Sequence, residues 1–325
     1  MARAIIHIGL HKTGSTSIQQ TFYKCASTFA TEGCIYPIHG TRWYGHHPLA
    51  WAAGAVHPSQ REINANDLVE RYLRATGDET LVLSSEDFYR VPLPNGSRVL
   101  QSLFEHFEKI DVVIYIRHPV EWVVSSYKWN VEKDPCRFSS FEDFLSRCNL
   151  EGWFNFTGRL DAWSKIPNSR LNVRAYVPDV VGDFSAFCGI RNTPAISSTN
   201  VSVRGISTIL TTAIAATLPS GPPRGLTSHI DKMVCEKTER DINLVSREKY
   251  EEIMQLCRER FLSLFASYPF EGMHDLLENR WQPGTMDSSE VMTLCQAVLD
   301  KLPKLSRVPG ALDGITRRLQ TRMLQ

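Results

Sequence analysis

The feature that most constrains the fold is an alternation of short apolar runs with helical patterns. The apolar runs are almost uninterrupted, as strands are when helices cover both faces of a parallel sheet. They comprise Arg3–Gly9, Thr80–Ser85, Asp111–Arg117 and Leu171–Val177, with Cys34–Ile38 as a weaker fifth. The helical patterns between them comprise Ser15–Ser27, Asn66–Thr76, Arg98–Lys109 and Val120–Glu132. Strand–helix alternation of this kind predicts an α/β fold with a parallel sheet flanked by helices.

The last third of the chain has a different character. Ser246–Ser267 is a strong amphipathic helix pattern, and it follows a Pro/Gly-rich break at Leu218–Leu226 that we interpret as a loop rather than a domain linker. A chain of 325 residues is long enough for one large α/β domain. We therefore expect a single domain over residues 1–325, with its core motifs in 4–205 and a helical C-terminal portion over about 206–325.

Charge and cysteine usage exclude several classes of function. With 36 Lys+Arg against 35 Asp+Glu, the formal net charge is +1, so no nucleic-acid partner is expected and an anionic ligand needs a local cluster. The eight cysteines form no C-x-x-C pair, which argues against a zinc site and a disulfide framework and favours a reducing compartment. The apolar run Ile206–Leu218 is shorter than the roughly 20 residues that span a bilayer. These features predict a cytoplasmic protein without a transmembrane segment.

The segment Ile6–Thr16, "IHIGLHKTGST", is the first candidate binding site. Gly9 and Gly14 keep the glycine spacing of a nucleotide-binding P-loop, but Lys12 precedes the second glycine and Ser15 stands where that lysine would be. A glycine-containing turn between a strand and a helix presents free backbone N–H groups and the positive end of a helix dipole. The segment therefore predicts an anion site, with a plain strand–helix turn and a solvated lysine as the alternative.

Side chains of this loop add to the predicted site. Lys12 supplies a positive charge, and the hydroxyls of Thr13, Ser15, Thr16 and Ser17 supply hydrogen-bond donors. No aspartate suited to magnesium stands at a strand end, which disfavours a metal-dependent kinase. We expect no bound metal.

A second candidate site follows the third apolar run, where Arg117-His118-Pro119 leads into a helix. A guanidinium at the carboxyl end of a strand can bind a phosphate bidentately, and Ser125 on the helix can add a hydroxyl. Ligands of open α/β sheets bind outside these strand ends. The alternative is an arginine in a structural salt bridge and a serine on an ordinary helix.

Together the two segments resemble the sulfotransferases that use 3′-phosphoadenosine 5′-phosphosulfate (PAPS). That family has a K-x-G-x-T loop after its first strand and an R-x-P…S-x-Y segment after a later strand. Here they read H-K-T-G-S-T and R-H-P-V-E-W-V-V-S-S-Y. The wording "HIGLHKTGSTSIQQ" is most similar to the bacterial branch, many of whose members modify saccharides, and the likeness extends over roughly residues 4–190.

The resemblance implies a P-loop-like sulfotransferase fold and a role for each matching residue. Lys12 would stabilise charge on the departing phosphate, and the backbone from Thr13 to Thr16 would bind the 5′-phosphate. Arg117 and Ser125 would bind the 3′-phosphate. The implied donor-binding set is His11, Lys12, Thr13, Gly14, Ser15, Thr16, Arg117 and Ser125. Arg204, in a short Val-Arg-Gly segment, is a weaker candidate with a surface arginine as the favoured alternative.

Transfer to a hydroxyl also requires a general base. Glu86 follows the second apolar run, at the edge of the sheet expected for Lys12, and a base at that strand end is a known arrangement in the family. His46 and His47 are the other candidates, because imidazole titrates near neutral pH. The alternatives are a helix-capping carboxylate and a pair of loop histidines. Which residue is the base stays open, with Lys12, Glu86 and His47 as the expected catalytic set.

The resemblance implies metal-independent sulfuryl transfer from PAPS to a hydroxyl, or as a second choice an amine, of a carbohydrate acceptor. Four aromatic residues in two segments could stack on sugar rings, with a place in the core as the alternative; these are Trp43, Tyr44, Trp51 and Trp129. Two other interpretations remain: a P-loop nucleotide kinase with a displaced lysine, and a non-catalytic nucleotide-binding module. The sequence does not indicate the acceptor or the oligomeric state.

Overall fold

A computed structural model describes residues 2–56, 64–92, 94–194, 203–216, 222 and 225–301. The chain divides into two compact units. The first comprises residues 1–118, 153–200 and 258–277, and the second comprises 119–152, 201–257 and 278–325. The expected single domain stays a prediction.

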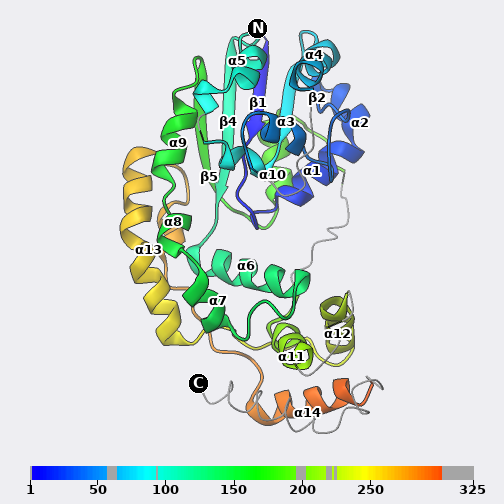
Figure 1. Ribbon diagram of the computed structural model, residues 1–325, viewed down its shortest axis with the longest axis vertical. Helices are drawn as coiled ribbons and strands as arrows, with labels where there is room; N and C mark the ends of the chain where they lie inside the picture. Colours follow the sequence, from blue (N-terminus) through cyan, green and yellow to red (C-terminus); the bar gives the residue numbers. More distant parts are fainter. Residues whose placement is uncertain are drawn as a thin grey trace. The chain divides into compact units, whose positions relative to one another are not determined.

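The first unit is built on a five-stranded sheet whose neighbouring strands all pair in parallel, as Figure 1 shows. The order is β2-β3-β1-β4-β5. The strands are β1 (Arg3–His7), β2 (Cys34–Ile35), β3 (Thr80–Ser84), β4 (Lys109–Ile116) and β5 (Ser169–Ala175). The predicted α/β class with a parallel sheet flanked by helices is confirmed.

The boundaries of several elements differ from the sequence expectation. The predicted helix Arg98–Lys109 ends at Phe104, because Lys109 pairs with Arg3 and belongs to β4. Strand β5 begins two residues earlier than predicted, since Ser169 pairs with Ile110 in the ladder. Residues that local apolar patterning assigns to helix or loop thus become strand residues, because they pair with a neighbouring strand.

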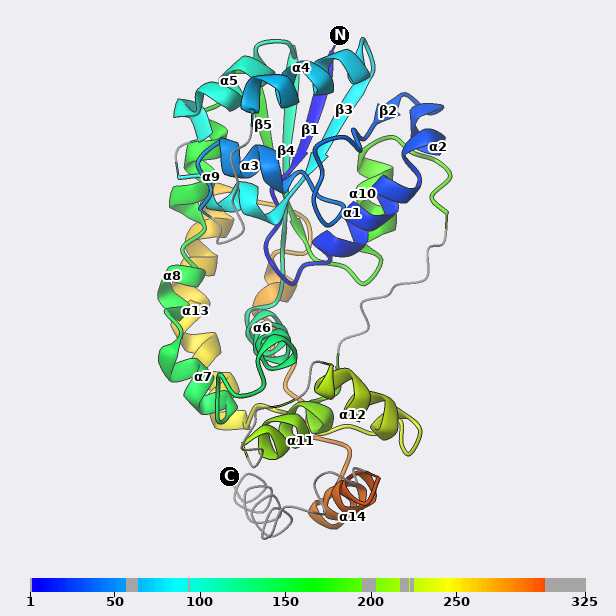
Figure 2. The same ribbon diagram turned by 45° about the vertical axis from the view of Figure 1, so that its right-hand side comes forward.

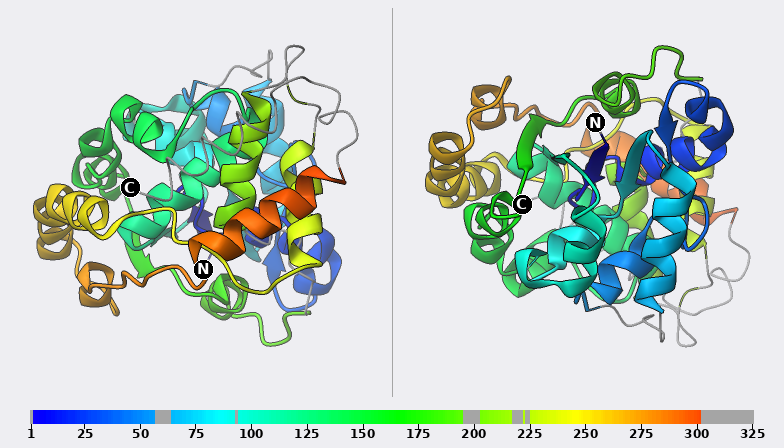
Figure 3. Two further views of the ribbon diagram at one scale, coloured as in Figure 1. Left: turned by 90° about the horizontal axis from the view of Figure 1, so that it is seen from below. Right: turned by 90° about the horizontal axis from the view of Figure 1, so that it is seen from above.

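Helices cover both faces of the sheet. One face carries a buried apolar cluster that joins Ile5, Val82 and Val113 of the strands to Phe22 and Phe184 of the covering helices. The helices of that face are α1 (Ser15–Lys24), α2 (Ala26–Ala30) and α10 (Val180–Phe187). Figure 3 shows α4 and α5 on the opposite side of the strands. The helices on that opposite side are α3 (His47–Ala52), α4 (Ala65–Thr76), α5 (Arg98–Phe104) and α9 (Thr157–Ser164).

The strand order places three polar segments at one edge of the sheet. Strand β1 lies between β3 and β4, with His7 level with Ser84 and Val113. The loop after β1 therefore leaves the sheet between the segment that follows β3 and the segment that follows β4. The 3-10 helix η1 (Glu86–Arg90) begins directly after β3.

The second unit is helical, and the predicted helical C-terminal portion is confirmed over its described residues. A buried apolar cluster joins α11 and α12 to α14. The helices of this unit are α6 (Pro119–Lys133), α7 (Phe141–Arg147), α11 (Gly205–Ala215), α12 (Leu226–Cys235) and α14 (Ser288–Leu299). Two helices, which Figure 2 labels, have residues in both units: α8 (Leu150–Trp153) and α13 (Arg247–Ser267). Two short 3-10 turns, η2 (Pro94–Gly96) and η3 (His274–Leu277), belong to the first unit. Most of the predicted loop Leu218–Leu226 lies outside the described residues.

The expectations about disulfides and about membrane-spanning segments can be compared with the structure. All eight cysteines are free thiols. Over the residues that the structure describes, no helix combines the length and apolar character that a membrane crossing requires.

Candidate active site

The loop after β1 has the geometry of an anion-binding turn. Lys12 has a φ of 67° and Gly14 a φ of 78°, so the backbone passes through the left-handed region twice before α1 begins. Gly9 also has a positive φ, and a Cβ atom there would lie 2.7 Å from Ser15 Oγ. A side chain at Gly9 would therefore crowd the Ser15 hydroxyl and strain the backbone, which explains the glycine.

The start of α1 is open to an anion. Its N-cap residue, Gly14, makes no side-chain capping hydrogen bond, and the first turn holds no acidic residue. The first backbone N–H groups of a helix have no partner within the helix, and the dipole makes this end positive. Such donors suit phosphate oxygens, and the role of the backbone from Thr13 to Thr16 stays a prediction.

Two of the loop hydroxyls have a different role from the one expected. Thr13 Oγ1 donates to the Leu10 carbonyl oxygen at 2.8 Å, and Ser15 Oγ donates to the same oxygen at 3.1 Å. Both side chains are buried, whereas Thr16 is exposed. The predicted outward donors at Thr13 and Ser15 therefore brace the loop from inside.

Arg117 joins the two sequence motifs. Its Nη1 donates to the Lys12 carbonyl oxygen at 3.1 Å, although the two residues are 105 positions apart in the chain. The guanidinium also lies over the Tyr176 ring, 5.0 Å from its centroid. A Cβ at Gly14 would come within 3.4 Å of that same ring. Arg117 and Tyr176 thus support the loop at its left-handed residues.

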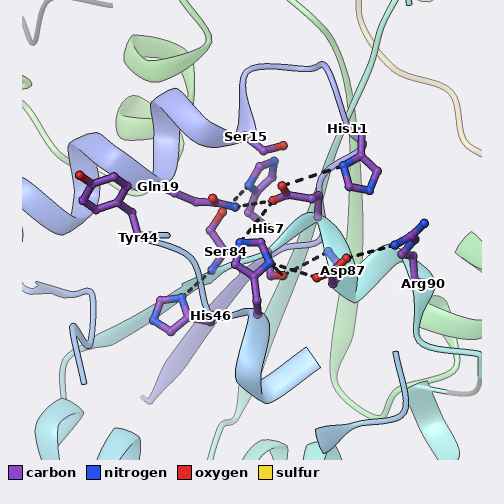
Figure 4. A network of polar contacts seen from close by, with 12 residues as sticks. His7, His11, Ser15, Gln19, Tyr44, His46, Ser84, Asp87 and Arg90 are labelled. Atoms are coloured by element: carbon purple, nitrogen blue, oxygen red, sulfur yellow. Dashed lines mark hydrogen bonds and ion pairs between the residues drawn. The ribbon is translucent and has the colours of Figure 1, made fainter. Parts of the chain in front are cut away.

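Glu86 lies on the other side of the loop. Its Oε2 accepts a hydrogen bond from Gln19 Nε2 at 2.8 Å, which joins it to α1, and its Oε1 lies 4.0 Å from Nδ1 of His11 (Figure 4). Burial raises the pKa of the Glu86 carboxyl, but the charges of His47 and His11 and the Gln19 hydrogen bond outweigh burial and lower it overall. Glu86 is therefore held as a carboxylate, with 18% of its side chain exposed.

His47 faces Glu86 and is fixed from behind. Its Nε2 lies 3.9 Å from Glu86 Oε2, and its Nδ1 lies 3.2 Å from Asp87 Oδ2 and 2.8 Å from Ser85 Oγ. Nδ1 is therefore held by two oxygens behind the ring, and Nε2 is directed toward Glu86. Trp51 Nε1 donates to Asp87 Oδ2 at 2.8 Å. Burial raises the pKa of Asp87, but bonds from His47 and Trp51 lower it to about 2.

His46 has no ring nitrogen directed at the site, and the expectation that it could act as the base is wrong. The ring is fully buried, its Nδ1 accepts from the Ser84 backbone N–H at 3.1 Å, and its Nε2 lies 2.9 Å from the Pro37 carbonyl oxygen. Burial lowers the pKa of His46 to about 3. Both nitrogens are occupied, so His46 ties two loops to β3 and cannot take a proton from a ligand.

Sequence reasoning missed three polar residues of this site. His7 at the end of β1 is fully buried, with Nδ1 2.8 Å from Ser84 Oγ, and burial lowers its pKa to about 4. Gln19 and Asp87 hold Glu86 and His47 in place. Asp87 was detectable beside Glu86 in "SSED", but nothing in the sequence shows that Gln19 faces β3. Figure 4 shows His7, Gln19 and Asp87 around these strand ends.

Ser125 and Arg204 belong to the second unit. Ser125 is partly buried on α6, and its neighbours Val124 and Lys128 line a surface depression of about 280 Å³ in that unit. Its place beside Arg117 stays a prediction. Arg204 Nη1 donates to the carbonyl oxygens of Thr238 and, at 3.3 Å, of Arg240, which fits the structural alternative for that residue.

In the described part of the chain, no group of three or more His, Cys, Asp or Glu side chains could hold a metal ion. The groups that do converge are hydrogen-bond donors, basic side chains and the carboxylates of Glu86 and Asp87.

Comparisons with known proteins find a similarity to a solved structure. No protein-family model and no curated protein matches the sequence. Among solved structures, the chain is similar to a sulfotransferase from Alicyclobacillus acidocaldarius, with 14% sequence identity and a TM-score of 0.43. The superposition covers 83% of this chain and 98% of that one.

Proposed function

We propose that this protein is a sulfotransferase that moves a sulfuryl group from PAPS to a hydroxyl, or as a second choice an amine, of a carbohydrate acceptor. The observation that carries the proposal is the hydrogen bond between Arg117 and the Lys12 carbonyl oxygen. It brings together, in the first unit of the fold, the Lys12 loop and the arginine that opens the second motif.

The donor site is the loop from His11 to Thr16. The open N–H groups at the start of α1 suit the 5′-phosphate, and Lys12 supplies a charge where the bridging oxygen departs. Arg117, already at the loop, suits the second phosphate, with Ser125 as the further predicted donor. A bound PAPS molecule supplies an activated sulfuryl group that needs positioning and charge stabilisation.

On the other side of the loop, Glu86 takes the acceptor proton. The acceptor oxygen forms the new bond to sulfur while the bond from sulfur to the phosphate oxygen breaks, and the proton of the hydroxyl passes to the Glu86 carboxylate. His47 Nε2 faces that carboxylate and can receive the proton from it, because Asp87 stabilises the imidazolium that forms. Lys12, Glu86 and His47 are then the catalytic groups.

The first experiment measures donor binding and transfer. Saturating 3′-phosphoadenosine 5′-phosphate (PAP) is expected to raise the thermal unfolding midpoint, as any ligand that binds only the native state does. Radiolabelled sulfate is then expected to pass from PAPS to one member of a panel of polysaccharides. Absence of any PAP-dependent stabilisation would falsify the proposal.

The Lys12→Ala variant tests the assigned chemistry. Loss of one transition-state donor is expected to lower turnover by about 100-fold or more while the fold stays intact. Unchanged turnover would reject the role of Lys12. Magnesium-dependent consumption of ATP would favour a nucleotide kinase, and PAP binding without transfer to any acceptor would favour a non-catalytic module.

A further inference from the structure

A short turn beside the Glu86 site presents an aromatic side chain in an unusual way. Arg42 and Gly45 close the turn through two backbone hydrogen bonds, of 2.8 Å and 3.0 Å. The two central residues, Trp43 and Tyr44, have φ values of 49° and 73°. Turns with positive φ at both central positions favour Asn and Gly, and bulky residues there are strained. Local folding preference therefore does not explain the two aromatic residues.

The strained turn leaves Trp43 at the surface. Its side chain is 55% exposed, and Tyr44 is 37% exposed. The guanidinium of Arg42 lies over the Trp43 ring at 4.4 Å from the centroid and over the Trp51 ring at 5.5 Å. This contact fixes the orientation of the exposed indole, because a cation is attracted to the ring face.

The turn is coupled to the proposed base. The Trp43 ring packs edge-on against His47, with ring centroids 5.9 Å apart, and His47 in turn faces Glu86. Gly45 has no room for a side chain, since a Cβ there would lie 2.7 Å from His47 Nε2 and 2.9 Å from Gln19. Both of those residues contact Glu86, so the turn lies directly against the side chains that surround this carboxylate.

We infer that the turn 42–45 is the acceptor subsite, and that the Trp43 indole stacks on the apolar face of a pyranose ring whose hydroxyl is directed at Glu86. The inference rests on the proposed function and adds the residues that select the acceptor. An exposed aromatic face next to polar and charged groups suits a ligand with one apolar C–H face and a rim of hydroxyls. A single indole beside a reactive carboxylate is too small a surface for a protein partner.

The test is a binding assay on an array of immobilised oligosaccharides, run with and without saturating PAP. The informative variant is Trp43→Asn, because Asn accepts a positive φ and keeps the turn while the indole is lost. We expect the wild-type protein to bind at least one pyranose oligosaccharide. The variant should lose at least about tenfold in that affinity, the loss typical of a buried aromatic anchor. Its PAP affinity should be unchanged and its unfolding midpoint equal or higher.

The matched control is Trp129→Asn, which removes a 42% exposed indole of the second unit and should leave glycan binding unchanged. Wild-type protein that binds no oligosaccharide, or a Trp43→Asn variant that keeps its affinity, overturns the inference. Lower stability of Trp43→Asn together with proportionate loss of PAP binding would assign Trp43 a structural role and also overturns it. Failure of PAP binding with glycan binding intact would instead remove the proposed function alone.

Discussion

The segments after β3 and after β4 occupy equivalent places in the fold and carry opposite chemistry. After β3, the carboxylates of Glu86 and Asp87 lie on either side of an imidazole, His47, which is supplied by α3. After β4, the group that reaches the loop is one guanidinium, at Arg117. Both segments touch the same loop from opposite sides, because β1 lies between the two strands. Under the proposed function, one side moves a proton and the other holds an anion.

The difference shows that the sheet sets where groups meet but not what they do. The register of β1 against β3 and β4 brings both segments level with the loop. The chemistry then depends on a few residues after each strand and on the helices that face them. Gln19 of α1 completes the β3 side, and Tyr176 after β5 completes the β4 side.

The largest expected effect is a loss of turnover without a loss of donor binding, and it tests the β3 side alone. Glu86→Gln is expected to lower kcat by roughly 100-fold or more, because a general base contributes on the order of 10² to 10⁴. PAP affinity should stay within a factor of about two, since the variant keeps its hydrogen bond with Gln19. Sulfate transfer from PAPS and PAP titration measure the two quantities.

The control for Glu86→Gln is Glu79→Gln, an exposed carboxylate at the opposite end of β3. A Glu86→Gln enzyme with wild-type kcat would show that the β3 side does not move the proton. A bell-shaped rate profile with its acid limb in the neutral range would move the base role to an imidazole, because the lowered pKa of Glu86 keeps that carboxylate ionised there.

The second test addresses the β4 side. Arg117→Ala is expected to weaken PAP binding by about 10- to 100-fold, the cost of a lost hydrogen bond to a charged group. Arg117→Lys should recover only part of the loss, because an ammonium cannot make the bidentate contact. Calorimetric titration of PAP measures both. Arg170→Ala, an exposed arginine on β5, is the control, and equal losses in the two alanine variants would contradict the assignment.

The third prediction concerns a histidine bonded to the β3 side, which makes the stability of the fold depend on pH. His7, bonded to Ser84 of β3, has its pKa lowered by burial from 6.5 to about 4. The unfolded chain therefore binds a proton that the folded chain excludes between these values, and stability is full above pH 6.5 and falls as the pH drops toward 4. The loss due to His7 amounts to about 3 kcal/mol.

Urea unfolding from pH 6.5 to pH 4.5 tests this expectation. In His7→Gln the slope of the unfolding free energy against pH should fall by about 1.4 kcal/mol per pH unit. His106→Gln, at an exposed position, and Arg117→Lys should both keep the wild-type slope. An unchanged slope in His7→Gln would mean that the buried ring is not held neutral.

The smallest expected effect concerns the loop between the two sides. Thr13→Val removes a buried hydroxyl that donates to the Leu10 carbonyl oxygen, and it should lower the unfolding free energy by about 1 kcal/mol. PAP affinity should change less than about twofold, since the hydroxyl points into the loop. A loss of affinity without loss of stability would restore the outward donor role expected from the sequence.

Much of this architecture follows from the sequence, and the reasons for the exceptions are physical. Apolar runs locate the four long strands, because strands buried on both faces need uninterrupted apolar residues. The end of α5 and the start of β5 were missed, since the pairing of Lys109 and Ser169 depends on strands that are distant in the chain. Local patterns contain no information about such partners.

The candidate site shows the same limit. Lys12, Arg117 and Glu86 were expected at one sheet edge, and strand order explains why they are there. The contrast between His46 and His47 was not predictable, because adjacent residues enter opposite environments at the first turn of α3. Gln19 is also invisible as a partner of Glu86 until the helix is docked against the sheet.

The glycine at position 45 has a consequence for changing what this protein acts on. No side chain fits there, whereas Trp43 and Tyr44 extend outward from the same turn. The turn thus places Gly45 against His47 and Gln19, and it leaves the side chains of Trp43 and Tyr44 partly exposed. A library randomised at Trp43 and Tyr44 alone should yield enzymes with new acceptors and the original donor chemistry. Any library that includes Gly45 should yield mostly inactive ones.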